Sequence, residues 1–590
     1  MCGICGEIRF NNTRVDESKM RHMMQSIIKR GPDHSDEYQH NNVYLGHRRL
    51  SVIDISSKSH QPMIDEKSNK VIVFNGVIYN YKEIRELLIN KGYSFSSDGD
   101  TEVILKSYDH YGEDCVKYLD GVFSFCIYDP DANKIFLARD RLGIKPLYYK
   151  LESKYFAFAS NTKALIGRND NEINHKSLHH QFTLHSVIPA PNTILKNIYK
   201  LEPGHSATVT SDGKILKNKY YALDDIKINH NIEENEIIEE SERLLMNAIE
   251  KRFYTADVDV GVLLSGGLDS SLIVAMAAKS KLSKINTFSI GFPTIKDEVG
   301  DEFYYSDMVS KQFNTNHYKY NINQDHLMEC LDDVIREMPE PMFSQDSSAF
   351  YLLAKEVSKN QKVVLSGQGA DELFGGYFWY KKMNEMKGSD SERFIEHYFD
   401  RGHEDYSKTI KEKYVSNNYS EELIESLFRK QRDDIGYLDK VLRIDLSTMV
   451  IDDPVKRVDS MTMSHGLETR VPFLDINLVE FLSSIPSTQK IKNDGKYYLK
   501  KLAEKYLSKD LIYRDKFYFP VPPLKILEGK FLNYAKEILL SKSCSNRGLY
   551  NQENINTLLL EPNSHFTKLN GNKVWHLALL ERWFQLNIDA

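Results

Sequence analysis

Long apolar segments are absent from this chain of 590 residues. No stretch approaches the roughly 18–20 apolar residues that a membrane-spanning helix requires, and the N-terminus lacks the apolar core of a signal peptide. A net charge of −7 and the lack of a long basic run argue against a dedicated nucleic-acid-binding role. We therefore expect a soluble globular protein with no membrane or nucleic-acid partner, long enough for two or more domains.

Cysteine is also scarce, and its spacing gives no sign of a zinc site. The six cysteines, at positions 2, 5, 115, 126, 330 and 544, show no paired CxxC spacing. One of them is the second residue of the chain. Removal of the initiator methionine would leave Cys2 with both a thiol and a free α-amine, and an α-amine with a pKa of about 7.7–8 can take the thiol proton at neutral pH. We therefore expect Cys2 to be a catalytic nucleophile, in a reducing, cytoplasmic environment.

Residues 1 to about 210 contain many short strand-like segments separated by turn residues. Two helical segments interrupt them, one near Met20–Lys29 and one from Tyr81 to about Lys91. This pattern predicts stacked antiparallel sheets with flanking helices. A polar stretch over 218–236 is typical of a linker, so we expect one domain over 1–217 and a second over 236–590. The clearest predicted strands are Val71–Phe74, Val122–Asp129, Lys134–Ala138, Leu147–Tyr149 and Tyr155–Ala159.

Strand-like and helical segments alternate after the linker. Val258–Leu264, Ile285–Ile290 and Lys362–Leu365 predict buried strands, and Ser271–Lys279 predicts a helix that follows the first of them. The alternation predicts an open, doubly wound parallel sheet covered by helices, with its ligand site at the carboxyl ends of the strands. Beyond about residue 380 the pattern is mostly helical.

A glycine-rich loop, Ser265-Gly266-Gly267-Leu268-Asp269-Ser270-Ser271, joins the first of these strands to its helix. Glycine permits a tight turn, and the N–H groups of a helix N-terminus favour an anion. The loop is not a Walker A motif, because it lacks Gly-Lys-Ser/Thr. It resembles instead the pyrophosphate loop of N-type ATP pyrophosphatases, which adenylate a carboxyl or carbonyl oxygen. A second turn after an apolar strand carries Asp371, which together with Asp269 would bind Mg²⁺ on the phosphates of ATP.

Ten segments of the chain resemble the glutamine-hydrolysing asparagine synthetase family, in the same order and over nearly the whole length. They are MCGICG (1–6), RGPD (30–33), GHRRLSVID (46–54), FNGVIYNY (74–81), DTEVI (100–104), RDRLGIKPLYY (139–149), SGGLDSS (265–271), TFSIGF (287–292), SGQGADELFGGY (366–377) and HGLETRVPFLD (465–475). The resemblance implies a two-domain α/β protein. Its N-terminal domain would be a class II glutaminase, an αββα sandwich of the N-terminal-nucleophile type. The second would be an ATP pyrophosphatase synthetase domain of the adenine nucleotide alpha hydrolase type, with a helical extension.

The resemblance also implies roles for individual residues. Cys2 would attack the side-chain amide of glutamine, and Asn75 and Gly76 would form the oxyanion hole. Arg49 would bind the α-carboxylate of glutamine and Asp100 its α-ammonium group. Lys516 would neutralise charge in the adenylation step. The residues expected to bind ATP are Leu264, Ser265, Gly266, Gly267, Asp269, Ser270, Ser271, Ser289, Ile290, Ser366 and Gly367, with Asp269 and Asp371 as metal ligands.

Two positions depart from the family pattern. Val77 stands where the family has an acidic residue beside the oxyanion hole, so one contact to the α-ammonium group of glutamine is expected to be missing. Gln368 stands where well-studied members have a glutamate that could take a proton from the attacking ammonia, and a glutamine side chain is not a base. Glu372, water or a pyrophosphate oxygen are the alternatives for that proton.

These observations predict a glutamine-dependent, ATP-driven amidation of a carboxylate, with aspartate as the simplest acceptor. Gln368 motivates a second hypothesis, an enzyme of the same architecture that amidates a metabolite, a peptide or a cell-wall precursor. A cyclase similar to β-lactam synthetase does not suit a chain with Cys2, Arg49 and Asn75. A non-enzymatic scaffold does not suit intact phosphate loops. The sequence leaves the oligomeric state open, a homodimer included.

Overall fold

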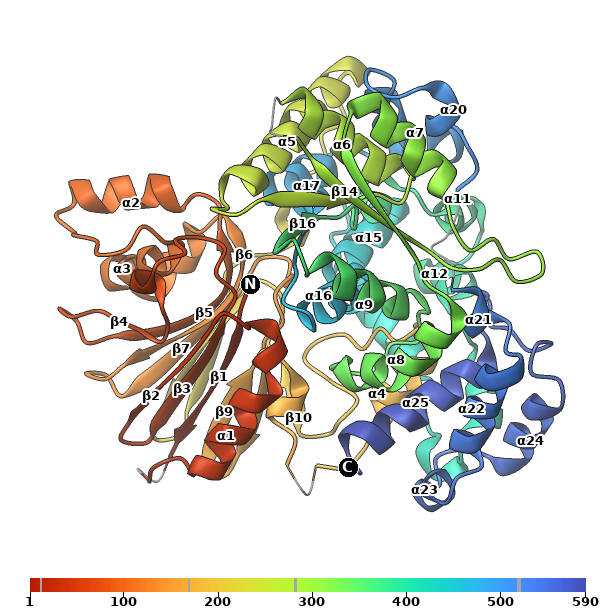
Figure 1. Ribbon diagram of the computed structural model, residues 1–590, viewed down its shortest axis with the longest axis horizontal. Helices are drawn as coiled ribbons and strands as arrows, with labels where there is room; N and C mark the ends of the chain where they lie inside the picture. Colours follow the sequence, from red (N-terminus) through yellow and green to blue (C-terminus); the bar gives the residue numbers. More distant parts are fainter. Residues whose placement is uncertain (11–12, 168–169, 281–283, 517–520, 590) are drawn as a thin grey trace.

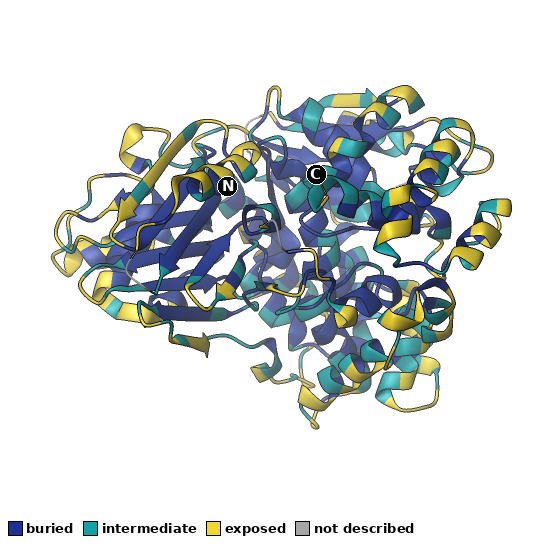
Figure 2. Cartoon of the chain, turned by 90° about the horizontal axis from the view of Figure 1, so that it is seen from below, coloured by how far each residue is buried: buried dark blue, intermediate teal, exposed yellow. Residues whose placement is uncertain are grey.

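The computed structural model describes residues 1–10, 13–167, 170–280, 284–516 and 521–589. A sheet-rich N-terminal part lies beside a mostly helical C-terminal part, and the two are in contact along one side (Figure 1). Burial is continuous from the sheets of the first part into the helices of the second, with exposed residues on the outer helices and loops (Figure 2). In the described residues, no helix is long and apolar enough to cross a membrane.

The N-terminal part is a sandwich of two six-stranded sheets, in the orders β10-β8-β9-β1-β3-β2 and β12-β11-β7-β6-β5-β4. All of the paired strands in both sheets run antiparallel. The strands are β1 Gly3–Arg9, β2 His34–His40, β3 Val43–Arg49, β4 Met63–Ile64, β5 Val71–Ile78, β6 Gly121–Asp129, β7 Lys134–Arg139, β8 Tyr148–Glu152, β9 Tyr155–Ala159, β10 Ile198–Lys200, β11 His205–Thr210 and β12 Ile215–Lys219.

Strand β5 shows why this part forms four layers. Its side chains alternate between the two faces of the sheet. Val71 and Val73 belong to the apolar cluster between the sheets, whereas Ile72 and Phe74 belong to the cluster under α2 and α3. The strand is apolar on both faces because both faces are covered. Helix α1 packs in the same way on the outer side of the first sheet, against β1 and β3.

The C-terminal part contains a five-stranded parallel sheet, in the order β15-β14-β13-β16-β17. Apolar residues of α8, α9 and α16 share one cluster with residues of this sheet, and those of α5, α6 and α17 share another, as a doubly wound fold requires. The strands are β13 Val260–Leu263, β14 Asn286–Gly291, β15 Asn316–Asn321, β16 Val363–Leu365 and β17 Glu468–Arg470.

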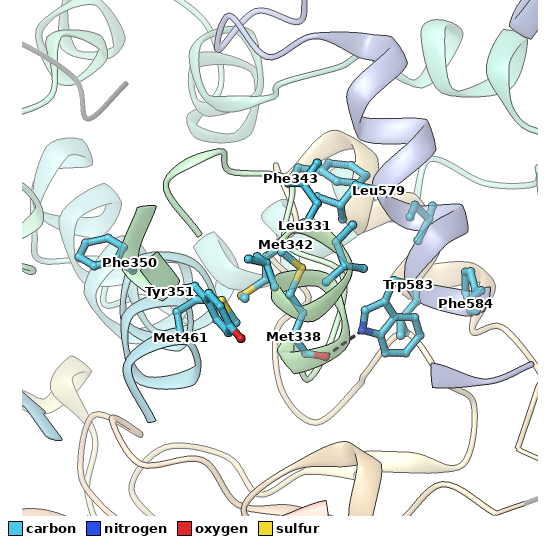
Figure 3. Packing of buried hydrophobic residues seen from close by; sticks show 14 of the residues in the cluster. Leu331, Met338, Met342, Phe343, Phe350, Tyr351, Met461, Leu579, Trp583 and Phe584 are labelled. Carbon is cyan, nitrogen blue, oxygen red and sulfur yellow. Dashed lines mark hydrogen bonds between the residues drawn. The ribbon is translucent and has the colours of Figure 1, made fainter. Parts of the chain in front are cut away.

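Helices make up most of the remaining C-terminal part, and one cluster of buried side chains connects several of them. The last helix, α25, places Trp583 beside the end of α8, where its indole N–H donates to the Met338 carbonyl at 2.9 Å (Figure 3). The helices are α1 Glu17–Ser26, α2 Tyr81–Asn90, α3 Asp100–Tyr111, α4 His175–Thr183, α5 Glu234–Tyr254, α6 Leu268–Lys279, α7 Phe303–Phe313, α8 Gln324–Glu337, α9 Asp346–Val357, α10 Ala370–Phe374, α11 Phe378–Glu385, α12 Asp390–Tyr398, α13 His403–Thr409, α14 Tyr419–Lys430, α15 Tyr437–Ile444, α16 Lys456–Met463, α17 Ile476–Ser483, α18 Ser487–Lys490, α19 Tyr497–Ala503, α20 Lys509–Ile512, α21 Pro522–Lys525, α22 Gly529–Leu539, α23 Lys542–Arg547, α24 Gln552–Leu560 and α25 Lys573–Asn587.

The predicted elements occur in the structure, with shifted ends. The strand predicted at Val71–Phe74 continues to Ile78, and the helix predicted at Ser271–Lys279 begins at Leu268. The predicted linker over 218–236 contains the end of β12, a short 3-10 helix and the first turn of α5. Strand β17 was not predicted, because its three residues carry no apolar pattern and form a strand only by pairing with β16.

Candidate active site

The Cys2 thiol lies directly before β1, at the end of the sandwich that faces the C-terminal part. The Cys2 N–H donates to Asn75 Oδ1 at 3.0 Å, and Cys2 Sγ lies 4.0 Å from the Leu50 carbonyl oxygen. Burial raises the pKa of the Cys2 thiol, while the positive charges of the chain terminus and Arg49 act in the opposite direction. A buried thiol of this kind needs a base at short range to become a nucleophile.

Asn75 and Gly76 lie on β5, across from Cys2. The Asn75 Nδ2 group donates to Ser124 Oγ at 3.4 Å, which orients the amide. Gly76 has no room for a side chain, because a Cβ there would lie 2.2 Å from the Val122 carbonyl oxygen on β6. The strand pairing therefore requires glycine at this position, and it places a backbone amide next to the Asn75 amide group.

Arg49 and Asp100 are both buried near the thiol. The Arg49 guanidinium group donates to the Ser56 carbonyl at 2.8 Å and to the Asp54 carbonyl. Burial lowers the pKa of Arg49, and the negative charges of Cys2 and Asp100 oppose this effect, so Arg49 lies close enough to both groups to interact with them. Burial raises the pKa of Asp100 to about 6, and its Oδ2 accepts the Ile78 N–H at 3.0 Å. The structure thus brings together the residues predicted to bind glutamine.

The glycine-rich loop leaves the carboxyl end of β13 and enters α6, as predicted. Gly266 has a φ of +83°, and a Cβ there would lie 2.7 Å from the Tyr305 Cβ and 2.8 Å from the Ser306 nitrogen. Inside the loop, Ser265 Oγ accepts the Gly267 N–H at 3.2 Å and lies 3.1 Å from Ser270 Oγ. Both hydroxyls are held close to the N-terminus of α6, where an anion is favoured.

A cleft of about 1050 Å³ opens at this edge of the parallel sheet. Gly266 and Ser271 do not line it: Ser271 is fully buried in α6, and Gly266 contributes its carbonyl to Arg514 Nη2 at 3.1 Å. The predicted residues that line the cleft are Leu264, Ser265, Gly267, Asp269, Ser270, Ser289, Ile290, Ser366, Gly367, Asp371 and Lys516.

The ammonium groups of two lysines form ion pairs with the predicted metal ligands. Lys496 Nζ lies 2.7 Å from both carboxylate oxygens of Asp269 and 2.9 Å from Asp371 Oδ1, and Lys516 Nζ lies 2.6 Å from the same Asp371 oxygen. Burial opposes ionisation of Asp371, yet the charges of Lys496 and Lys516 lower its pKa below the usual range. Burial raises the pKa of Asp269, with Lys496 acting against it.

This pair of carboxylates fits a magnesium ion that also binds phosphate. Asp269 and Asp371 present hard oxygen donors within reach of one ammonium group, so a cation can contact both. In the described part of the chain, no group of three or more His, Cys, Asp or Glu residues could hold a metal ion. Magnesium sites that use one or two carboxylates obtain their other ligands from water and substrate phosphates, which matches the phosphate loop beside them.

Two protein families match this chain one after the other. Residues 1–221 match the family described as glutamine amidotransferase domain, and residues 240–585 match the family described as asparagine synthase. The chain belongs to the glutamine-hydrolysing asparagine synthetase family. The predicted two-domain α/β fold class is thereby confirmed, since the first match covers the antiparallel sandwich and the second covers the parallel sheet.

Three relatives from Bacillus subtilis (strain 168) illustrate the extent of the similarity. The chain is 31% identical to glutamine-hydrolyzing asparagine synthetase 1, over 100% of this chain and 97% of that protein. It is 31% identical to synthetase 3, over 99% of this chain and 98% of the relative. It is 28% identical to synthetase 2, over 82% and 67% respectively. The chain is therefore an enzyme of the glutamine-hydrolysing asparagine synthase type.

The two departures from the pattern of asparagine synthetases occupy different environments. Val77 is buried in an apolar cluster that also contains Met1 and Tyr79, at the contact between the two parts. Gln368 lines the cleft, where its Oε1 accepts the Ser366 hydroxyl at 2.9 Å. Burial, together with the negative charge of the adjacent Asp371, raises the pKa of Glu372 to about 7.

Sequence reasoning missed Lys496, although it lies at the centre of the cleft. The residue has a left-handed φ of +52° and ends a run of four left-handed residues, 493–496, before α19. Strained backbone of this kind is concentrated at functional sites. The turn residues Asn493, Asp494 and Gly495 were the available signal in the sequence, and a turn does not identify a lysine of the cleft.

Proposed function

We propose that this enzyme transfers the amide nitrogen of glutamine to aspartate and cleaves ATP to AMP and pyrophosphate, giving asparagine and glutamate. One observation carries the proposal: a single chain holds both a buried thiol beside an Asn–Gly pair and a phosphate loop beside two carboxylates. In this proposal residues 1–217 form the glutaminase domain and residues 236–590 the synthetase domain. The enzyme would operate in the cytoplasm on small molecules only.

In the glutaminase, removal of Met1 would free the α-amine of Cys2 as the local base. The Cys2 sulfur would attack the amide carbon of glutamine, with Asn75 and Gly76 as donors to the oxyanion. Ammonia leaves as the thioester forms, and water then releases glutamate. Arg49 and Asp100 would hold the α-carboxylate and α-ammonium groups of the substrate. Val77 offers no charge there, so of the residues predicted to bind glutamine Asp100 alone would contact the α-ammonium group.

In the synthetase, an oxygen of the acceptor carboxylate would attack the α-phosphorus of ATP, and pyrophosphate would leave. Ser265, Gly267 and Ser270 would bind phosphate oxygens, and Lys516 would neutralise charge as the leaving group departs. Asp269 and Asp371 would hold Mg²⁺, which supplies positive charge to the phosphates when it is bound. Ammonia would then attack the acyl carbon and displace AMP.

The direct test supplies the protein with ATP, Mg²⁺, glutamine and aspartate and measures asparagine, AMP and pyrophosphate. We expect all three in equal amounts. A Cys2→Ala variant should lose the glutamine-dependent reaction and keep the reaction with ammonium chloride, because the two chemical steps use separate residues. Loss of both reactions in this variant, or no product from the wild-type protein, would contradict the proposal.

A second candidate acceptor class follows from Gln368. This side chain is fixed by Ser366 and cannot accept a proton from the attacking ammonia, so the acceptor chemistry can differ from that of aspartate. The alternative is amidation of another carboxylic acid, on a metabolite, a peptide or a cell-wall precursor. ATP–pyrophosphate exchange with a panel of carboxylic acids separates the two, since only the true acceptor supports exchange.

A further inference from the structure

A buried carboxylate of the C-terminal part is linked to Cys2 through the side chain of one arginine. Arg30 Nη2 donates a hydrogen bond of 2.9 Å to Oδ2 of Asp459, which lies on α16. The same arginine uses its Nε to donate to the backbone carbonyl of Cys2 at 3.1 Å. One guanidinium group therefore connects the Cys2 backbone to Asp459 on α16, which lies 429 residues after Arg30 in the sequence.

This connection is buried on all sides. Arg30 and Asp459 are each 5% exposed, and Lys145, which donates to Asp459 Oδ1 at 3.2 Å, is 2% exposed. Burial works against ionisation of Asp459, but Arg30 and Lys145 lower its pKa, so the carboxylate is charged at neutral pH. Both cations come from the sandwich and the Asp459 carboxylate from the C-terminal part, so these contacts exist only when the two parts are in contact.

Helix α16 is also held from the opposite side. Arg457, two residues before Asp459, pairs with Asp346 at 2.9 Å, and both line the nucleotide cleft. Figure 1 shows α16 at the boundary between the sandwich and the helical part. Contacts within the C-terminal part therefore hold α16 and the Asp459 carboxylate in place. Arg30 contacts both this carboxylate and the Cys2 backbone.

We propose that Asp459 is a positioning residue for the glutaminase: through Arg30 it sets the backbone of Cys2 so that the thiol meets the amide carbon of glutamine. The inference rests on the proposed role of Cys2 as nucleophile. Arg30 alone is not sufficient, because its side chain needs an anion to fix its orientation at the buried contact. A nucleophile displaced by about 1 Å can lose about 10²-fold in rate.

The test compares Asp459→Asn with Glu337→Gln. The Glu337 carboxylate also crosses the boundary, to Lys29 at 3.1 Å and Lys163 at 3.4 Å, but these lysines do not touch Cys2. We expect Asp459→Asn to lower kcat with glutamine by about 10²-fold, with the KM for glutamine and the ammonium-dependent rate within about twofold of wild type. The Glu337→Gln variant should change neither rate by more than about twofold.

A charge-matched variant protects the test against a folding defect, since Asp459→Asn leaves two buried cations with no anion. Combining Asp459→Asn with Lys145→Met removes one negative and one positive charge, so the net charge of the cluster is unchanged. This double variant should show the same selective loss of kcat with glutamine. The inference is overturned if both variants lose ammonium-dependent synthesis to the same extent, or if their glutamine-dependent rate matches that of Glu337→Gln.

Failure of the proposed function gives a different pattern. If the wild-type protein forms no product from either nitrogen source, or a Cys2→Ala variant still uses glutamine, then Cys2 is not the nucleophile of the proposed reaction. Wild-type activity with both sources and an unaltered ratio in the Asp459 variants would instead remove only the positioning role.

Discussion

The two sites of this enzyme differ in how their side chains are held in place. Around Cys2, the groups are enclosed and already bonded within the protein: the Cys2 N–H donates to the fully buried Asn75 amide, and the Cys2 carbonyl accepts from buried Arg30. In the cleft, two carboxylates and two lysines compensate one another next to open space. A site made of buried contacts is ordered before its substrate arrives, whereas paired charges beside open space can exchange partners. The first depends on shape and the second on charge balance.

The largest effect that this difference predicts concerns Asp371→Asn. Because the carboxylate orders both Lys496 and Lys516 and would hold the metal, its loss should lower both glutamine- and ammonium-dependent synthesis by about 10³-fold. Steady-state rates with each nitrogen source measure this. Asp494→Asn is the control, since that exposed carboxylate lines the same cleft and pairs only with Lys381, and it should change the rates by less than about twofold. A selective loss with glutamine would break the comparison.

The second prediction concerns Asn75→Ala in the site around Cys2. It removes one oxyanion donor and the acceptor of the Cys2 N–H, so kcat with glutamine should fall by about 10²-fold. The ammonium-dependent rate should stay unchanged, because no charge of the cleft is altered. An equal fall in both rates would show that the sandwich supports the cleft as well as the thiol.

The third prediction concerns the pH dependence of glutamine binding through Asp100, in the site around Cys2. Burial raises its pKa to about 6, so the carboxylate is charged above that pH and loses its charge as the pH falls. The KM for glutamine should therefore be lowest above pH 6 and rise by about tenfold per pH unit below it. Asp100→Asn should show a high KM with no inflection near pH 6, and an inflection that persists in this variant would assign it to another group.

The smallest effect is expected away from both sites, at Trp583→Phe. The substitution removes the indole N–H that donates to Met338 and leaves a buried carbonyl without that donor, which costs about 1–3 kcal/mol. Thermal unfolding should shift to lower temperature while both synthetic rates at 25 °C stay as in wild type. A loss of either rate would show that the corresponding site depends on the packing of α25.

Local patterns in the sequence predicted the parts of the molecule that are determined locally. The short apolar run Val71–Phe74, bounded by turn residues, and the glycines before Asp269 predicted β5 and the phosphate loop, because strand propensity and tight turns depend on neighbouring residues. Cys2 was predicted as a nucleophile from its position in the chain, whereas its glutamine substrate and the role of Lys516 came from resemblance to a family. Neither source predicted Lys496 or the Arg30–Asp459 pair, because these contacts join segments 227 and 429 residues apart and only the folded chain brings them together.

The lysines between Asp269 and Asp371 also have a consequence for how the cleft is filled. Each of the two carboxylates has an ammonium neighbour within the protein itself, and the proposed ligands are ATP and Mg²⁺. On arrival, phosphate oxygens can take over the ammonium groups while the accompanying cation takes over the carboxylates. Filling is then a swap of counter-charges, in which no buried ion has to stand uncompensated at any stage.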